Sequence, residues 1–207
     1  MPFPYGGTVT GTAENEQQSP WPAILTWRAH DARRMESVRV QLSGNRLKAY
    51  GRIVSAHTDT APAFSASYDL VTDESGATKR LSMTVTLGER ERQLSIARDE
   101  ENMWLVQAPS GQTSRVGFDG ALDVDVVFSP FFNALPIRRT GLHRRTESLT
   151  LPVVYVWLPE LEVKPATLSY ASRGDGGIDL TSPVAETRIT VDDGGFIEDY
   201  PGLAERI

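Results

Sequence analysis

The stretch Leu81-Ser82-Met83-Thr84-Val85-Thr86-Leu87 alternates apolar and polar residues at every position. Side chains along a β-strand point to opposite faces in turn, so this period of two predicts a strand with one buried and one solvated face. The alternation recurs before and after this stretch, in runs at 38–42, 64–70, 94–96, 104–106 and 122–128. Glycine-containing turns separate several runs. The pattern predicts antiparallel strands that pair in chain order, as a meander.

Residues 129–141 interrupt the alternation. Ser129-Pro130 suits the start of a helix, because serine caps free N–H groups and proline fits the first helical position. This turn is expected to end at Leu135, since a residue before proline avoids helical angles. A second turn can run from Pro136 and stop at Gly141. The chain is therefore predicted to be mostly β, with one or two short helical turns near 129–141.

The domain organisation expected from the sequence is simple. Residues 1–23 are rich in Gly, Thr, Pro, Gln and Glu and are predicted to be a flexible N-terminal arm. No linker or shift in composition divides residues 24–207, which are predicted to form a single domain. The longest apolar run, Val153 to Leu158, is far too short to cross a membrane, and no export signal is apparent at the N-terminus. A cytoplasmic protein without integral membrane association is expected.

Composition excludes several classes of function. The 27 acidic residues outnumber the 21 basic ones and give a net charge of −6, which argues against nucleic acid as a partner. The chain has no cysteine, so disulfides, thiolate metal sites and cysteine nucleophiles are excluded. With three histidines, a multi-histidine metal centre is not expected. We therefore predict no metal and no cofactor, and the sequence does not indicate an oligomeric state.

Motifs for catalysis are weak. The sequence contains neither a G-x-S-x-G nucleophile elbow nor a glycine-rich phosphate loop before a helix. The same-face pair Asp123 and Asp125 could serve as acid and base in a glycosidase, and His30 could belong to a hydrolase site. These residues keep a hydrolase acting on a sugar or ester as an alternative, although the expected protein is not an enzyme.

One segment departs from the alternating pattern. Residues 151–158 read Leu-Pro-Val-Val-Tyr-Val-Trp-Leu and are apolar on both faces. Both faces must then be covered, either by the short helical segment or by an apolar ligand in a cavity. Tyr155 and Trp157 carry polar groups on apolar rings and suit the mouth of such a cavity.

Charged residues cluster just before this segment. Asp119, Asp123 and Asp125 fall within ten residues, and the arginine-rich stretch 138–147, which includes Arg138 and Arg139, carries a net charge of +3 (four arginines against one glutamate). One interpretation is a solvated face with local Asp–Arg pairs, which add little stability when exposed. The other is that the arginines bind an anionic or hydroxyl-rich headgroup through their planar donor groups.

Linked segments in the second half of the chain carry a family resemblance. They are Gly-Phe-Asp-Gly-Ala-Leu-Asp-Val-Asp-Val at 117–126, Phe-Ser-Pro at 128–130, Asn133, Leu-Pro-Ile-Arg-Arg at 135–139, Leu-Pro-Glu-Leu-Glu-Val-Lys-Pro at 158–165 and Asp-Tyr-Pro-Gly-Leu at 199–203. Together they resemble the bacterial family described as "putative glycolipid-binding", formerly a domain of unknown function. The chain departs from that family in the bulky Ser-Pro-Phe-Phe at 129–132 and lacks the lipobox cysteine of periplasmic lipid carriers.

The resemblance implies a strongly curved antiparallel sheet, or incomplete barrel, that binds a glycolipid or another amphiphilic small molecule without catalysis. A structural or interaction protein with a filled core is a further alternative. The candidate ligand-binding residues are aromatic or polar side chains expected on the concave face or beside the helical turn: Tyr68, Trp104, Phe128, Asn133, Arg138, Arg139, Tyr155 and Trp157. The resemblance also marks a polar cluster of Asp119, Asp123 and Asp125.

Overall fold

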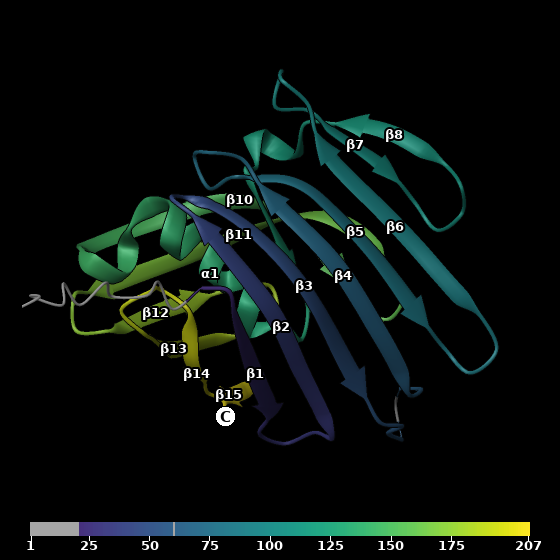
Figure 1. The fold of residues 1–207 in the computed structure, drawn as a ribbon, viewed down its shortest axis with the longest axis horizontal. Coiled ribbons are helices and arrows are strands. Elements are labelled where there is room, and N and C mark those ends of the chain that lie inside the picture. Colours follow the sequence, from purple (N-terminus) through teal and green to yellow (C-terminus); the bar gives the residue numbers. More distant parts are fainter. Residues whose placement is uncertain (1–20, 60) are drawn as a thin grey trace, which may run out of the picture.

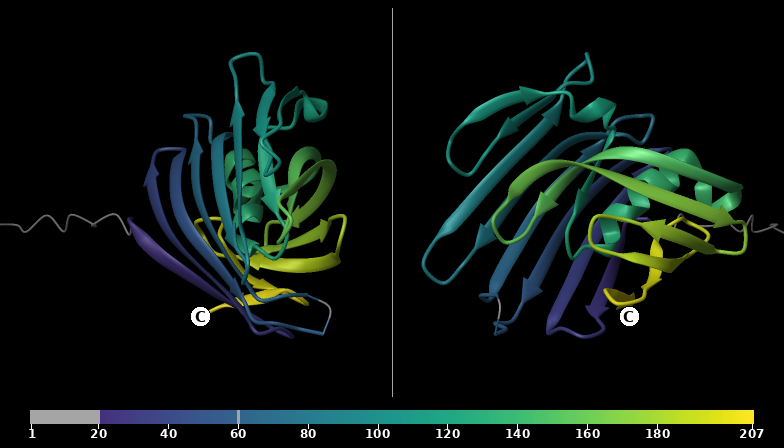
Figure 2. Two further views of the ribbon diagram at one scale, coloured as in Figure 1. Left: turned by 90° about the vertical axis from the view of Figure 1, so that its right-hand side faces the viewer. Right: turned by 180° about the vertical axis from the view of Figure 1, so that it is seen from behind.

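A computed structural model of the chain describes residues 21–59 and 61–207. These residues form one open sheet of 15 strands that curves around a single α-helix, α1 (Pro130–Thr140) (Figures 1 and 2). In the side view of Figure 2, α1 lies between the blue strands of the first half and the green and yellow strands of the second half. The prediction of a mostly-β, strongly curved sheet is confirmed.

The first half of the sheet is an antiparallel meander in chain order. Leu81, Met83 and Val85 are buried while Ser82 and Thr84 are partly exposed, as the alternation of this stretch predicts. The strands are β1 (Ala23–Ala29), β2 (Arg34–Ser43), β3 (Arg46–Ser55), β4 (Phe64–Thr72), β5 (Thr78–Thr86), β6 (Glu91–Arg98), β7 (Trp104–Gln107) and β8 (Thr113–Val116).

The second half contains seven strands: β9 (Asp123–Val126), β10 (Thr146–Trp157), β11 (Glu162–Arg173), β12 (Gly177–Thr181), β13 (Glu186–Val191), β14 (Ile197–Tyr200) and β15 (Ala204–Arg206). Two pairings depart from a simple meander. β15 pairs with β1 and joins the halves, and β9 pairs with β10 in parallel. A parallel pair needs a crossover connection, which α1 and the short 3-10 turn η2 (Leu142–Arg144) supply; a second such turn, η1 (Phe118–Gly120), precedes β9.

The predicted break of the helix at Leu135 is wrong, because α1 continues through Pro136 and ends at Gly141, whose φ is +68°. Proline removes one helical hydrogen bond and disfavours helical angles before it. Packing outweighs this cost, since every residue from Pro130 to Ile137 is buried. The rings of Phe131 and Phe132 lie 6.1 and 5.0 Å from the ring of Tyr68. The inside of the curve is therefore a packed core with α1 at its centre.

Residues 1–20 of the predicted N-terminal arm lie outside the described residues. Of its remaining three residues, Trp21 packs against Phe196 with 5.1 Å between ring centroids, and Ala23 begins β1. Within the described part of the chain, no helix has the length and apolar character needed to cross a membrane.

Gly51, in the middle of β3, allows Tyr68 to reach its position. The two residues are directly opposite in the β3–β4 pairing, and the Tyr68 ring lies across the glycine. A Cβ atom at Gly51 would stand 2.1 Å from Cζ of Tyr68. The close approach requires glycine because any side chain would push the ring away from the core.

Gly51→Ala should therefore lower the free energy of unfolding by about 1–3 kcal/mol, the usual cost of overpacking a core. Urea denaturation followed by circular dichroism measures this change. Gly88→Ala is the matched control, because a Cβ there would meet no atom within 4 Å. Equal stability of the two variants would contradict the role given to Gly51.

Candidate ligand-binding pocket

A pocket of about 450 Å³ opens where α1 begins, and its volume is within the range of small-molecule sites. Its walls come from the start of β2, the turn from β9 to α1, the end of β10, and the β12–β13 and β14–β15 turns. The lining residues are Arg34, Asp125, Val126, Val127, Phe128, Ser129, Asn133, Tyr155, Trp157, Ser182, Val184, Ala185, Glu186, Thr187, Tyr200, Pro201, Gly202 and Leu203.

The turn between β9 and α1 aims Phe128 at this pocket. The Ser129 N–H donates to the carbonyl of Val126 at 3.1 Å and closes the turn. Phe128 itself has φ of +72°, a left-handed conformation that is unusual for a bulky residue. The guanidinium of Arg34 lies 4.3 Å from the centroid of its ring, a cation–π contact.

Glu36 is buried behind this turn and accepts three hydrogen bonds. The hydroxyl of Tyr68 donates at 2.7 Å, that of Ser129 at 2.6 Å, and the N–H of Phe131 at 3.4 Å. The carboxyl group of Glu36, on the distant strand β2, thus accepts a backbone N–H of the first turn of α1 that has no partner within the helix. Burial raises the pKa of Glu36 to about 7, although these hydrogen bonds and the charge of Arg34 oppose the rise.

Asp125 lines the pocket directly and is only 5% exposed. One carboxyl oxygen accepts the backbone N–H of Val126 at 2.9 Å. Among the described residues no group donates to the other oxygen. Burial, together with the charge of Glu36, raises the pKa of Asp125 to about 7. Near neutral pH this carboxyl can therefore either accept a hydrogen bond or, when protonated, donate one.

Aromatic side chains form the adjoining part of the wall, because Tyr155 is the partner of Asp125 in the parallel β9–β10 pairing. The rings of Tyr155 and Trp157 meet edge to face, 5.3 Å apart. Burial raises the pKa of both Tyr155 and Tyr200, so their phenol groups stay protonated and can donate. Asn133 accepts the hydroxyl of Tyr170 at 3.0 Å, which leaves its amide nitrogen as a donor. The pocket combines apolar ring faces with a few polar groups.

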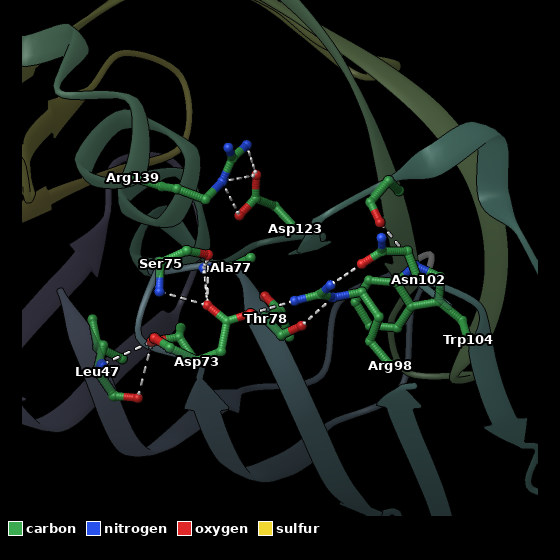
Figure 3. Close-up of polar contacts among 12 residues, drawn as sticks. Leu47, Asp73, Ser75, Ala77, Thr78, Arg98, Asn102, Trp104, Asp123 and Arg139 are labelled. Carbon is green, nitrogen blue, oxygen red and sulfur yellow. Dashed lines mark hydrogen bonds and ion pairs between the residues drawn. The ribbon is translucent and has the colours of Figure 1, made fainter. Parts of the chain in front are cut away.

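Five of the residues singled out from the sequence meet in this pocket: Asp125, Phe128, Asn133, Tyr155 and Trp157. Tyr68 lies behind it, in contact with Glu36. Trp104 is fully buried elsewhere in the core, and its indole N–H donates to the carbonyl of Ala121 at 2.9 Å (Figure 3).

The arginine cluster lies at the far end of α1. Figure 3 shows Arg139 bound to Asp123, with 2.6 Å between Nη2 and Oδ2. Burial raises the pKa of Asp123 although Arg139 opposes the rise. Arg138 stacks over the ring of Phe196 at 4.5 Å. Asp119 is exposed on η1.

The predicted solvated Asp face is wrong, because Asp123 and Asp125 are both buried. One part of that interpretation is present, since Arg139 pairs locally with Asp123. Asp125 has no arginine partner and opens into the pocket instead. Within residues 21–59 and 61–207, no three histidine, aspartate or glutamate side chains are grouped to hold a metal ion.

Sequence reasoning missed Arg34, Glu36, Ser182 and Tyr200 as parts of the site or its support. Glu36 left a visible signal, because it occupies the same strand face as the apolar residues Val38 and Val40. A charged residue on the buried face of a strand needs a partner. Tyr200 stands within the Asp-Tyr-Pro-Gly-Leu motif, whereas Ser182 carried no signal.

The chain matches the model of a protein family described as "Putative glycolipid-binding" over residues 24–206. Its fold is similar to the crystal structure of a DUF1089 family protein from Pseudomonas aeruginosa, with a TM-score of 0.69 and 24% sequence identity. That similarity covers 87% of this chain and 95% of the other, and at this identity it shows the fold alone. No curated protein matches the chain. The family resemblance expected from the sequence is confirmed.

The raised pKa values of Glu36 and Asp125 predict a pH-dependent stability. Each folded-state pKa of about 7 exceeds the ordinary value of 4.5 or 3.8, so the folded state binds more protons and loses stability as pH rises between these limits. Between pH 5 and 7 each carboxyl contributes a fall of about 1.4 kcal/mol per pH unit. Urea denaturation at several pH values should show this slope, and Asp125→Asn should reduce it. The exposed-site variant Asp119→Asn should keep the parent slope, and a flat parent profile would contradict the prediction.

Arg139→Ala should destabilise the fold by about 3 kcal/mol, because it leaves the Asp123 carboxylate buried without its partner. Adding Asp123→Asn removes the buried charge and should restore part of the loss. Urea denaturation at neutral pH measures both variants. A stability of Arg139→Ala equal to that of the parent would show that the pair is energetically unimportant.

Proposed function

The chain belongs to the "Putative glycolipid-binding" family, and we propose that its pocket binds the sugar headgroup of a glycolipid-like amphiphile without catalysing a reaction. The observation that carries this proposal is the Asp125 carboxyl group. It is almost completely buried, yet one oxygen faces no protein donor and the residue lines a pocket. Within the described residues no protein group occupies this oxygen, so a hydroxyl of a ligand in the pocket can bond to it.

The remaining lining favours a sugar over a purely apolar ligand. Sugar hydroxyls both donate and accept, which matches the carboxyl of Asp125, the amide of Asn133 and the phenol of Tyr155. The C–H faces of a sugar ring pack on aromatic rings, and Tyr155, Trp157 and Phe128 supply such surfaces. A few polar groups on a mainly apolar wall are typical of small-molecule sites.

The charges favour an uncharged headgroup. Asp125 and Glu186 both line the pocket, with Glu36 buried behind it, whereas Arg34 is the single basic lining residue. Its guanidinium already stacks on Phe128 and interacts with Glu36. A phosphate or sulfate group would meet more negative than positive charge here, so neutral sugars fit this electrostatic field better.

The alkyl part of the amphiphile cannot enter the centre of the fold, since Phe131 and Phe132 of α1 fill it. Val184 and Leu203 line the pocket and give it an apolar rim. The proposed arrangement therefore holds the headgroup inside and leaves the alkyl chain along this rim. The ligand is carried at one end of the curved sheet and not along its interior.

A hydrolase is less well supported. Glycoside hydrolysis generally uses two free carboxyl groups on opposite sides of the scissile bond. Glu36 is engaged by three donors at the start of α1, and Asp123 is paired with Arg139. Neither is free to work with Asp125, which leaves Glu186, an exposed residue at the start of β13, as the other carboxyl group of the pocket lining.

A soluble alkyl glucoside, used below its critical micelle concentration, tests the proposal through tryptophan fluorescence. Trp157 lines the pocket, whereas Trp27 and Trp104 are fully buried and Trp21 packs against Phe196 outside the pocket lining. A bound headgroup should therefore change the emission mainly of Trp157. Trp157→Ala should abolish most of the change. A glucoside that binds by calorimetry with the same fluorescence response in this variant would place the ligand elsewhere.

Asp125→Ala should weaken glucoside binding about tenfold, the usual effect of losing one hydrogen bond to an ionisable group. Asp119→Ala is the matched control, because Asp119 belongs to the same sequence motif but lies exposed on η1. Titration calorimetry compares the two variants, and native mass spectrometry of the freshly purified protein identifies any co-purified lipid. Equal affinities of the two variants would contradict the role of Asp125.

A further inference from the structure

The outward side of β1, β2 and β3 combines basic and apolar side chains. In Figure 1 this side of the strands faces the viewer and no other described element crosses it. Its basic residues are Arg28, Arg39, Lys48 and Arg52, all exposed. We refer to the outward side of these three strands as the outer face.

The charge of the outer face is opposite to that of the whole protein. The chain carries a net charge of −6. Among residues 21–59 the only acidic residues are Asp31, Glu36 and Asp59; Asp31 and Asp59 lie outside the three strands, and Glu36 is buried on the inner side. Arg28 pairs with Glu205 of β15, while no ion pair within the described part of the chain engages the other three basic residues. Three of the four basic residues of this surface therefore present positive charge without an ion-pair partner among the described residues.

Four large apolar side chains share this surface. Ile24, Met35, Tyr50 and Val54 are 70, 41, 48 and 43% exposed. The strand register interleaves them with the basic residues: Met35 stands between Arg28 and Val54, and Arg39 stands between Ile24 and Tyr50. At the usual strand spacing, these residues cover about 10 by 20 Å. Met35 and Val54 are direct neighbours in this register, whereas Arg39 separates Ile24 from Tyr50, so small apolar areas alternate with basic groups.

We propose that the outer face docks the protein on an anionic phospholipid bilayer. Basic side chains attract the negatively charged lipid surface, and apolar side chains interleaved among them insert into the interface between headgroups and acyl chains. Nucleic acid would bind the basic side chains of the outer face but would leave its apolar side chains exposed to water. An anionic bilayer can contact both the basic and the apolar side chains of the outer face.

The position of the outer face relative to the pocket supports this occupant. A shallow groove at its edge, of about 590 Å³, is lined by Arg28, Arg33, Arg34 and Met35 among others. Arg34 also lines the ligand-binding pocket. A protein docked in this way would hold the entrance of the pocket next to the bilayer, although docking itself does not require that the pocket binds a glycolipid.

Vesicle co-sedimentation tests the proposal with the full chain. Vesicles of equal parts phosphatidylcholine and phosphatidylglycerol should bind the protein, and vesicles of phosphatidylcholine alone should bind it far less. Each basic side chain near an anionic surface strengthens binding by about fivefold, so Arg39→Gln with Arg52→Gln should weaken it by more than about tenfold. Raised salt should reduce binding because it screens the charges.

The matched control is Lys79→Gln with Arg90→Gln, which changes the net charge equally at two exposed positions away from the outer face. This control should bind vesicles like the parent. Three results would overturn the proposal. They are equal losses of vesicle binding in both double variants, parent-like vesicle binding by Arg39→Gln with Arg52→Gln, and displacement of the vesicles by duplex DNA. Thermal unfolding confirms that each variant is folded.

Two crossed measurements separate this proposal from that of the pocket. Arg39→Gln with Arg52→Gln should keep the parent affinity for the soluble glucoside, and Asp125→Ala should keep the parent affinity for glycolipid-free anionic vesicles. If the vesicles fail to bind while the glucoside binds, docking is wrong and the pocket assignment stands. The reverse result overturns the pocket assignment alone.

Discussion

The burial of the Glu36 carboxyl group at the start of α1 is the interaction on which this fold depends. A helix begins with N–H groups that have no partner inside the helix. Ser129 precedes α1 but makes no side-chain cap of its own; its hydroxyl donates to Glu36 instead. The N–H of Phe131 turns to the same carboxyl group, 95 residues away in sequence. A single side chain of β2 therefore fixes the helix that connects β9 to β10.

This arrangement has an electrostatic consequence for the pocket. A carboxyl group without water is costly, and three donors together with Arg34 offset only part of that cost, which is why burial dominates and raises the pKa of Glu36. Asp125, one turn of chain before α1, is subject to the same low-dielectric surroundings and to the charge of Glu36. Asp125 thus lines the pocket with a raised pKa, and Glu36, buried behind the pocket, adds to that rise. The pocket gains a group that can donate to, or accept from, a hydroxyl.

The sequence alone was sufficient for the strands and for part of the pocket. Alternation such as that of Leu81, Met83 and Val85 depends on local chemistry, so the mostly-β class could be predicted. The dense motif from 117 to 139 pointed to Asp125, Phe128 and Asn133 because these residues are close in sequence. Arg34 and Glu36 reach the same place from β2 through tertiary pairing, which no local pattern encodes. For the same reason the continuation of α1 through Pro136 was missed, since burial on all sides outweighs the local preference of proline.

The start of β2 connects the two surfaces to which we assign binding. Arg34 and Glu36 are two residues apart and point to the inner side, whereas Met35 between them points outward. One short segment therefore carries the support of α1, an edge of the pocket and an apolar contact of the outer face. Consecutive side chains of a strand point to opposite sides of the sheet, so the backbone of β2 fixes the orientation of the pocket entrance relative to the outer face. A headgroup entering beside Arg34 would move only a short distance from a bilayer held by Met35 and its neighbours, and its alkyl chain need never cross water.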